Sequence, residues 1–85
     1  SVSHDEHINI PAHHLLADVL GMAPEELHPH NQLQHYGFDS ISCIQLLQLL
    51  QSKVDPLVTL AELQASQTVR DMTDVIAKKQ EDAYL

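Results

Sequence analysis

The stretch HYGFDSISCIQLLQLL, residues 35–50, sets a glycine, an aspartate and a serine directly before a mostly apolar run with helical spacing. Asp39 and Ser40 are residue types that favour a helix N-terminus. Asp55 and Pro56 prevent a helix from continuing far beyond Ser52. The stretch therefore predicts a helix from Asp39 or Ser40 to about Ser52. At about 100° per residue its apolar, buried face contains Cys43, Leu46, Leu47 and Leu50.

Similar patterns predict three further helices. The first runs from about residue 10 to 20, stops at Gly21, and carries its apolar residues at helical spacing: Ile8, Ala12, Leu15, Leu16, Val19 and Leu20. TLAE, residues 59–62, is a capping-box pattern that opens a short third helix ending near Ser66. Thr68 caps a last helix that ends near Lys78 and Lys79; its apolar stripe is Val69, Met72, Val75 and Ile76.

The connection between the first two helices is long, and prolines and a closing glycine keep it from being helical throughout. Only Leu27, Leu33 and Tyr36 are candidate core residues in it. The fold class predicted is therefore an all-α four-helix bundle with a short third helix and a long first loop. We expect residues 1–7 to be a linker or an expression remnant, residues 8–80 to form one domain, and residues 81–85 to be a flexible tail.

The bulk composition limits the function. Twelve acidic against four basic residues give a formal net charge of −8, which disfavours nucleic acid as a partner. No apolar run is long enough to span a bilayer. A single cysteine, Cys43, on the buried face, favours core packing over thiol chemistry and is compatible with a reducing compartment. No leader opens the chain, so we expect a cytoplasmic protein.

The seven histidines raise the question of a metal site. His4 with His7, or His28 with His30 and His35, are close enough in sequence to share an ion. Most of them lie in predicted loops, and none forms a helical pair with a suitably placed carboxylate. We therefore expect exposed, titrating histidines and no metal.

Ser40 has three possible roles on the residues alone. It is a suitable plain N-cap. It is a poor hydrolase nucleophile, because GFDSI lacks the G-x-S-x-G pattern and no histidine is placed as its base. It also suits covalent attachment of a phosphate: Gly37 permits a sharp turn, Asp39 can cap the helix, and a phosphodiester on Ser40 would face the positive end of the helix dipole.

GFDSIS, residues 37–42, resembles the G-x-D-S-[LI] attachment motif of acyl carrier proteins. LADVLGMAPEEL at 16–27, NQLQHYGFDS at 31–40 and TVRDMTDVI at 68–76 are also similar to that family. The resemblance implies that Ser40 carries 4′-phosphopantetheine, transferred from coenzyme A by a phosphopantetheinyl transferase that reads Asp39 and Ile41. YGFDSIS looks most like carriers of modular polyketide synthases served by separate acyltransferases.

The resemblance further implies a non-catalytic domain, monomeric when isolated, that holds acyl or polyketide intermediates as thioesters. It would present them to acyltransferase, ketosynthase and other synthase domains in polyketide, or mixed polyketide and nonribosomal peptide, biosynthesis. A peptidyl or aryl carrier of a nonribosomal peptide synthetase is the alternative. A helical interaction module without a prosthetic group is another, although it assigns no purpose to GFDSI.

The second helix departs from the acidic docking helix that is usual in fatty acid carriers. Its polar side carries Ser42, Gln45, Gln48, Gln51 and Ser52, with Lys53 as the nearest charge. Ile41 and Leu49 project on this polar side, where burial does not account for them. We therefore expect partner enzymes to dock mainly on Ile41, secondarily on Leu49, and beside Gln45 and Gln48.

Overall fold

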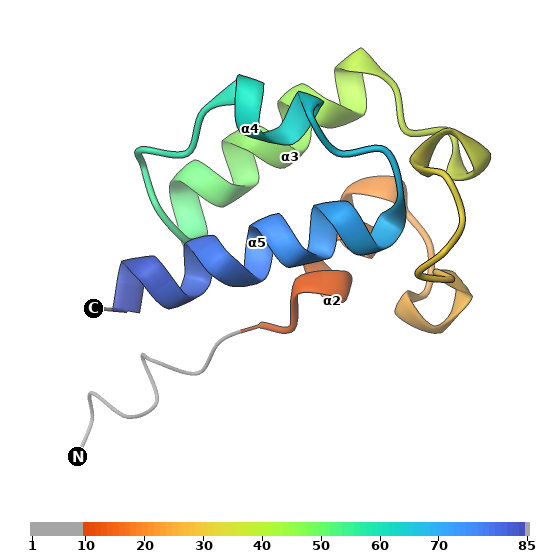
Figure 1. The fold of residues 1–85 in the computed structure, drawn as a ribbon, viewed down its shortest axis with the longest axis horizontal. Coiled ribbons are helices and arrows are strands. Elements are labelled where there is room, and N and C mark those ends of the chain that lie inside the picture. The colour runs from red at the N-terminus through yellow and green to blue at the C-terminus, as the bar shows by residue number, and fades with distance from the viewer. Residues whose placement is uncertain (1–9, 85) are drawn as a thin grey trace.

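The computed structural model describes residues 10–84, and in that range the chain is helical, with no β-strand. In chain order the elements are α2 (Ala12–Leu20), the 3₁₀ turns η1 (Pro24–Glu26) and η2 (Leu33–Tyr36), α3 (Ser40–Lys53), α4 (Leu60–Gln64) and α5 (Val69–Tyr84). Figure 1 shows the two long helices α3 and α5 with the short α4 beside them and α2 behind α5. The predicted all-α four-helix architecture is confirmed.

The core lies where α2 packs on α3 and α5 and where α4 closes the bundle against both long helices. Each fully buried leucine contributes about 1.5–3 kcal/mol, so burial outweighs any one helix cap of about 1 kcal/mol. The buried face predicted for the second helix is confirmed, except that Leu47 is only partly buried. The largest fully buried side chains are Leu16, Leu46, Leu50, Val58, Leu63, Met72 and Ile76.

Helix α2 begins two residues later than predicted. Pro11 stands at its N-cap with ψ of 141°, an extended conformation, and Ile10 precedes a proline, which disfavours helical geometry there. Gly21 ends the helix as predicted, with a left-handed φ of 69°. Ile8 and the whole expected linker, residues 1–7, lie outside the described residues.

The long loop is held by side chains that pack in the core and by backbone hydrogen bonds to the start of α5. Leu27 and Leu33 are buried and Tyr36 is partly buried, which confirms the three predicted core anchors. The Leu33 N–H donates to the Gln67 carbonyl at 2.8 Å, and the Val69 N–H donates to the Asn31 carbonyl at 3.0 Å. The loop is therefore fixed against the segment that leads into α5.

The N-terminal caps predicted for α4 and α5 are both present. Thr59 and Glu62 form the capping box of α4, with the Thr59 N–H donating to Glu62 Oε2 at 2.8 Å. Thr68 and Asp71 exchange two hydrogen bonds of 3.1 Å at the start of α5. These bonds satisfy N–H groups that the first turn of a helix leaves without partners.

The predicted end of the last helix is wrong, because α5 continues past Lys79 to Tyr84. Residues 80–83 include no glycine or proline that could stop it. Lys79 forms an ion pair with Glu62 on α4, so its charge serves packing between helices rather than a helix end. Most of the expected tail is thus helical, while the domain boundaries at 8 and 80 stay predictions. In the described part of the chain, no helix is long and apolar enough to cross a membrane.

Candidate functional site

A sharp turn delivers the chain from the loop to α3. Gly37 ends η2 with φ of 80°, a left-handed conformation in which side-chain-bearing residues are strained. The Phe38 N–H donates to the Leu33 carbonyl at 3.3 Å, and its ring packs partly buried against the core. Gly37 and Phe38 therefore fix the direction in which the next two residues leave the loop.

Asp39 is the N-cap of α3. Its Oδ1 accepts hydrogen bonds from the Ser42 backbone N–H at 2.9 Å and from Ser42 Oγ at 3.0 Å. The hydrogen bond from the Ser42 N–H is the main reason that the pKa of the Asp39 carboxyl lies below its usual value. The reading of Ser40 as a plain N-cap is thus wrong, because Asp39 fills that position.

Ser40 is the first residue of α3, and its side chain is exposed. The helix is 14 residues long, and the N–H groups of its first turn have no partners within the helix. An oxygen-linked phosphate on Ser40 would meet the N–H groups of this turn that Asp39 does not cap, and the positive end of the dipole. The chemistry of this site fits a phosphodiester attached to the Ser40 hydroxyl.

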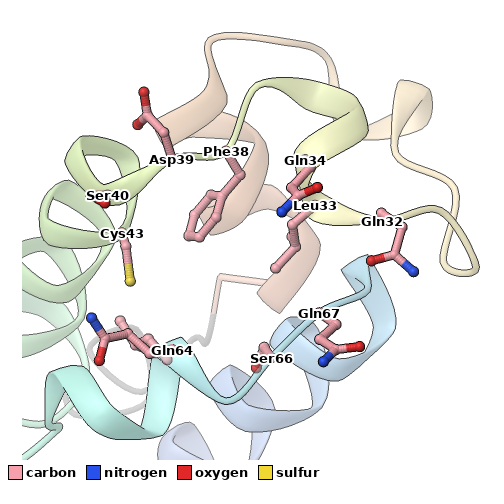
Figure 2. A pocket seen from close by; sticks show the side chains of 11 residues that line it. Gln32, Leu33, Gln34, Phe38, Asp39, Ser40, Cys43, Gln64, Ser66 and Gln67 are labelled. Carbon is pink, nitrogen blue, oxygen red and sulfur yellow. The ribbon is translucent and has the colours of Figure 1, made fainter.

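A groove of about 420 Å³ opens beside Ser40. One wall comes from the loop at 32–34 and Phe38, a second from the first turn of α3, and a third from residues 63–67. Figure 2 shows Gln34 on the loop side and Gln64 on the α4 side, with the Cys43 sulfur between α3 and α4. Sequence reasoning missed the groove, because its walls are distant in sequence.

The exposed face of α3 differs in part from the prediction. Ile41 is 67% exposed, and Gln45 and Gln48 are also exposed, as predicted. Leu49 is partly buried and packs against the core, so the prediction that it projects to solvent is wrong. Ile44 is 46% exposed, so it and not Leu49 is the second exposed apolar residue on this face of α3. We name Ile41, Ile44, Gln45 and Gln48 the α3 stripe.

The position of Leu49 follows from helix geometry. At 100° per residue, Leu49 lies 80° from Ile41 on the side that approaches the core residue Leu46, whereas Ile44 lies 60° from Ile41 on the other side. A residue at such a boundary is buried or exposed according to its neighbours. Helical periodicity alone therefore cannot place Leu49.

Cys43 and the histidines are the remaining candidate groups. Cys43 is only 6% exposed, and burial raises the pKa of its thiol, so it packs in the core as predicted. Among residues 10–84, no three histidine, cysteine or acidic side chains come together as a metal site would require. The pair His4 and His7 lies outside this range.

Two comparisons with known proteins bear on this site. Residues 13–76, 64 of the 85, match the family described as "Phosphopantetheine attachment site". The whole chain is also 71% identical to part of "Polyketide synthase PksR" of Bacillus subtilis (strain 168), and it spans only 3% of the length of that relative. By its sequence match, the chain belongs to the phosphopantetheine attachment family, whose prosthetic group is 4′-phosphopantetheine.

Proposed function

We propose that this chain is an acyl carrier domain that holds acyl or polyketide intermediates as thioesters on a 4′-phosphopantetheine arm attached to Ser40. The observation that carries the proposal is the exposed Ser40 hydroxyl in the first turn of α3, where Asp39 already fills the capping position. The 71% identity to part of a polyketide synthase supports polyketide, or mixed polyketide and peptide, biosynthesis as the setting. The domain would then work within a longer synthase.

The neighbours of Ser40 have separate roles in this proposal. Gly37 sets the turn, and Asp39 holds the first turn of α3, in which Ser40 is exposed. A transferase would join Ser40 Oγ to the phosphorus of coenzyme A that bears the pantetheine. The bond from that phosphorus to the bridging oxygen breaks, adenosine 3′,5′-bisphosphate leaves, and the hydroxyl proton is released. The terminal thiol of the arm supplies the thioester chemistry, and the domain itself is non-catalytic.

Ser42 is the nearest competing hydroxyl and is a poorer attachment site. Its Oγ donates to Asp39 Oδ1 at 3.0 Å, and its side chain is only partly exposed. Modification of Ser42 would break that bond and weaken the cap of α3. Ser40 can be modified without loss of any hydrogen bond that holds the helix.

The α3 stripe is the proposed docking surface for partner enzymes. It begins next to Ser40 and carries no charge, so apolar contact with Ile41 and Ile44 would provide most of the attraction. Gln45 and Gln48 flank these two side chains and can hydrogen-bond to a partner. The phosphopantetheinyl transferase, an acyltransferase and a ketosynthase are the partners that this role requires. Leu49 has a smaller part because the core already covers much of it.

The proposal is tested by the intact mass of the protein after incubation with coenzyme A and a broad-range phosphopantetheinyl transferase. We expect the mass to increase by one phosphopantetheine group, with the modification on the peptide that contains Ser40. A helical module without a prosthetic group would keep its original mass. Loading with aminoacyl or aryl rather than acyl groups by its native partners would favour a peptidyl or aryl carrier instead.

A further inference from the structure

The hydroxyl of Tyr36 ties two parts of the long loop together. The His28 backbone N–H donates to Tyr36 Oη at 2.9 Å, and Asn31 Nδ2 donates to the same oxygen at 3.0 Å. The Tyr36 side chain is partly buried, and the His35 ring meets its ring edge-on with the centroids 5.1 Å apart. The phenol is therefore held both at its oxygen and at its ring.

Both donors to Tyr36 belong to a turn, residues 28–31, that is anchored to α5. The Val69 N–H donates to the Asn31 carbonyl at 3.0 Å. The Arg70 N–H donates to the Pro29 carbonyl, also at 3.0 Å. The first turn of a long helix thus fixes the turn to which the Tyr36 hydroxyl binds.

On its other side, Tyr36 leads directly to Ser40, with only residues 37–39 between them. Gly37 comes first, and glycine is the residue with the most backbone freedom. A turn at glycine keeps its direction only if the chain is held on both sides of it. Phe38 packs against the core on one side, and Tyr36 is held on the other. Within the loop, residues 21–39, the two bonds to Tyr36 are the side-chain hydrogen bonds that join residues more than three positions apart.

We propose that Tyr36 is a positioning residue for the loading of Ser40, because its hydroxyl fixes the end of η2 from which α3 departs. The inference rests on the proposed attachment of 4′-phosphopantetheine to Ser40. Attack on phosphorus requires the Ser40 oxygen to lie in line with the bond that breaks, and a displacement of about 1 Å can slow such a step about 10²-fold. Tyr36 is not part of the α3 stripe, so its loss acts on kcat rather than on binding of the transferase.

The test measures kcat and KM for loading of the 85-residue chain by a phosphopantetheinyl transferase with coenzyme A. Tyr36→Phe keeps the ring and removes the acceptor, so kcat should fall about fivefold or more while KM for the domain changes less than about twofold. Asn31→Leu removes one of the two bonds from the opposite side and should lower kcat less. The double variant should be no slower than Tyr36→Phe, because the bond is already absent there.

Asn31→Asp is the conservative variant that should rescue the contact. A carboxylate cannot donate to Tyr36 Oη, but it can accept the hydroxyl proton, so the link is kept with its direction reversed. Its kcat should therefore stay close to the parental value, in contrast to Asn31→Leu. Equal rates for the two Asn31 variants would overturn the proposal, and this comparison does not depend on whether Tyr36→Phe folds.

A second measurement does not require loading. The Ser42 N–H donates to Asp39 Oδ1 in the first turn of α3, and its hydrogen exchange in the unloaded chain should be about threefold faster in Tyr36→Phe. Gln51→Met is the matched control, because Gln51 Nε2 donates to the Val58 carbonyl at 3.0 Å near the other end of α3. It removes a hydrogen bond of similar length and should leave both kcat and the exchange of the Ser42 N–H unchanged.

The outcomes separate this proposal from the proposed function. A parent chain that does not load would overturn the proposed function, and the positioning role with it. A parent that loads, with parental kcat in folded Tyr36→Phe, would overturn the positioning role alone. An equal fall of kcat in Gln51→Met would also overturn it, because any loss of stability would then be sufficient.

Discussion

Asp39 Oδ1 accepts both the backbone N–H and the hydroxyl of Ser42, at 2.9 and 3.0 Å. Asp39 thus binds Ser42, and neither of these bonds involves Ser40, the proposed attachment residue. Because of this arrangement, the cap of α3 does not depend on the Ser40 hydroxyl, for which we propose modification. Attachment chemistry and helix stability can therefore be separated by substitution.

Ser40→Ala should abolish loading and leave the fold intact. Asp39 still caps α3, and alanine is a better helix former than serine, so the free energy of unfolding should change by less than about 0.5 kcal/mol. Thermal unfolding and intact mass measure the two effects. Ser42→Ala is the control: it should lower the melting temperature by removing a hydrogen bond and still accept the arm. Mass addition to the Ser40→Ala protein would assign the attachment to another residue.

Acid should weaken the contact between α4 and α5. The ion pair with Lys79 is the main cause of the lowered pKa of Glu62, about 2 against an ordinary 4.5, and the Thr59 N–H bond adds to it. A carboxyl whose pKa is lower in the folded state stabilises the protein above pH 4.5, and this contribution is lost as the pH falls towards 2. Glu62→Gln should therefore reduce the decline in melting temperature between pH 4.5 and 2.

Glu25→Gln provides the comparison for that experiment, because Glu25 is an exposed acidic residue in η1 on a different part of the surface. It removes one carboxylate without removing an ion pair to α5. If Glu25→Gln and Glu62→Gln changed the acid dependence equally, the ion pair with Lys79 would not be its cause.

Added salt should stabilise the domain near neutral pH. The formal net charge of −8 is large for 85 residues, and repulsion between carboxylates opposes the compact state. At about 0.1 M salt the screening length is about 10 Å, so salt weakens the repulsion between carboxylates that lie farther apart than this. Melting temperatures measured from low to high salt, and with added divalent cations, should rise. A melting temperature that stays constant or falls in both series would show that repulsion does not limit stability.

Features encoded by neighbouring residues could be predicted from the sequence. The caps Asp39, Thr59 and Thr68 depend on bonds three residues apart, and the buried face of α3 depends on helical spacing. Ser40 is predicted as the attachment site because Gly37, Asp39 and Ser40 are close enough in sequence to form one local turn, and the structure contains that turn. Short-range geometry was therefore sufficient for the turn and the helix cap beside Ser40.

Features that depend on distant segments could not be predicted. The charge of Lys79 was taken as the sign of a helix end, whereas it pairs with Glu62 on α4, a partner that the sequence does not reveal. Ile44 and Leu49 lie near the boundary between the exposed and buried sides of α3, and only the packed neighbours decide between them. The groove needs residues 32–38 and 63–67 to meet. Each of these is a tertiary property.

Substitutions in the α3 stripe should weaken the binding of partner enzymes to the domain without unfolding it. Ile41 and Ile44 are 67% and 46% exposed, so alanine at either position removes little buried area and should change the free energy of unfolding by less than about 1 kcal/mol. If the transferase covers both side chains, the double substitution should cost about 1.4 kcal/mol of binding, which corresponds to a tenfold lower kcat/KM. Initial rates of loading, measured by mass spectrometry, check this.

Leu57→Ala is the control that tests whether slower loading comes from loss of the α3 stripe or from loss of any exposed apolar side chain. Leu57 is 80% exposed, more than either isoleucine, but it lies in the connection between α3 and α4 and not on the stripe. It should load at the parental rate, while Ile41→Ala and Ile44→Ala load more slowly. Because the stripe carries no charge, the ratio of variant to parental rate should change little with ionic strength. Parental rates for the double isoleucine variant, or an equal loss in Leu57→Ala, would mean that partners bind elsewhere on the domain.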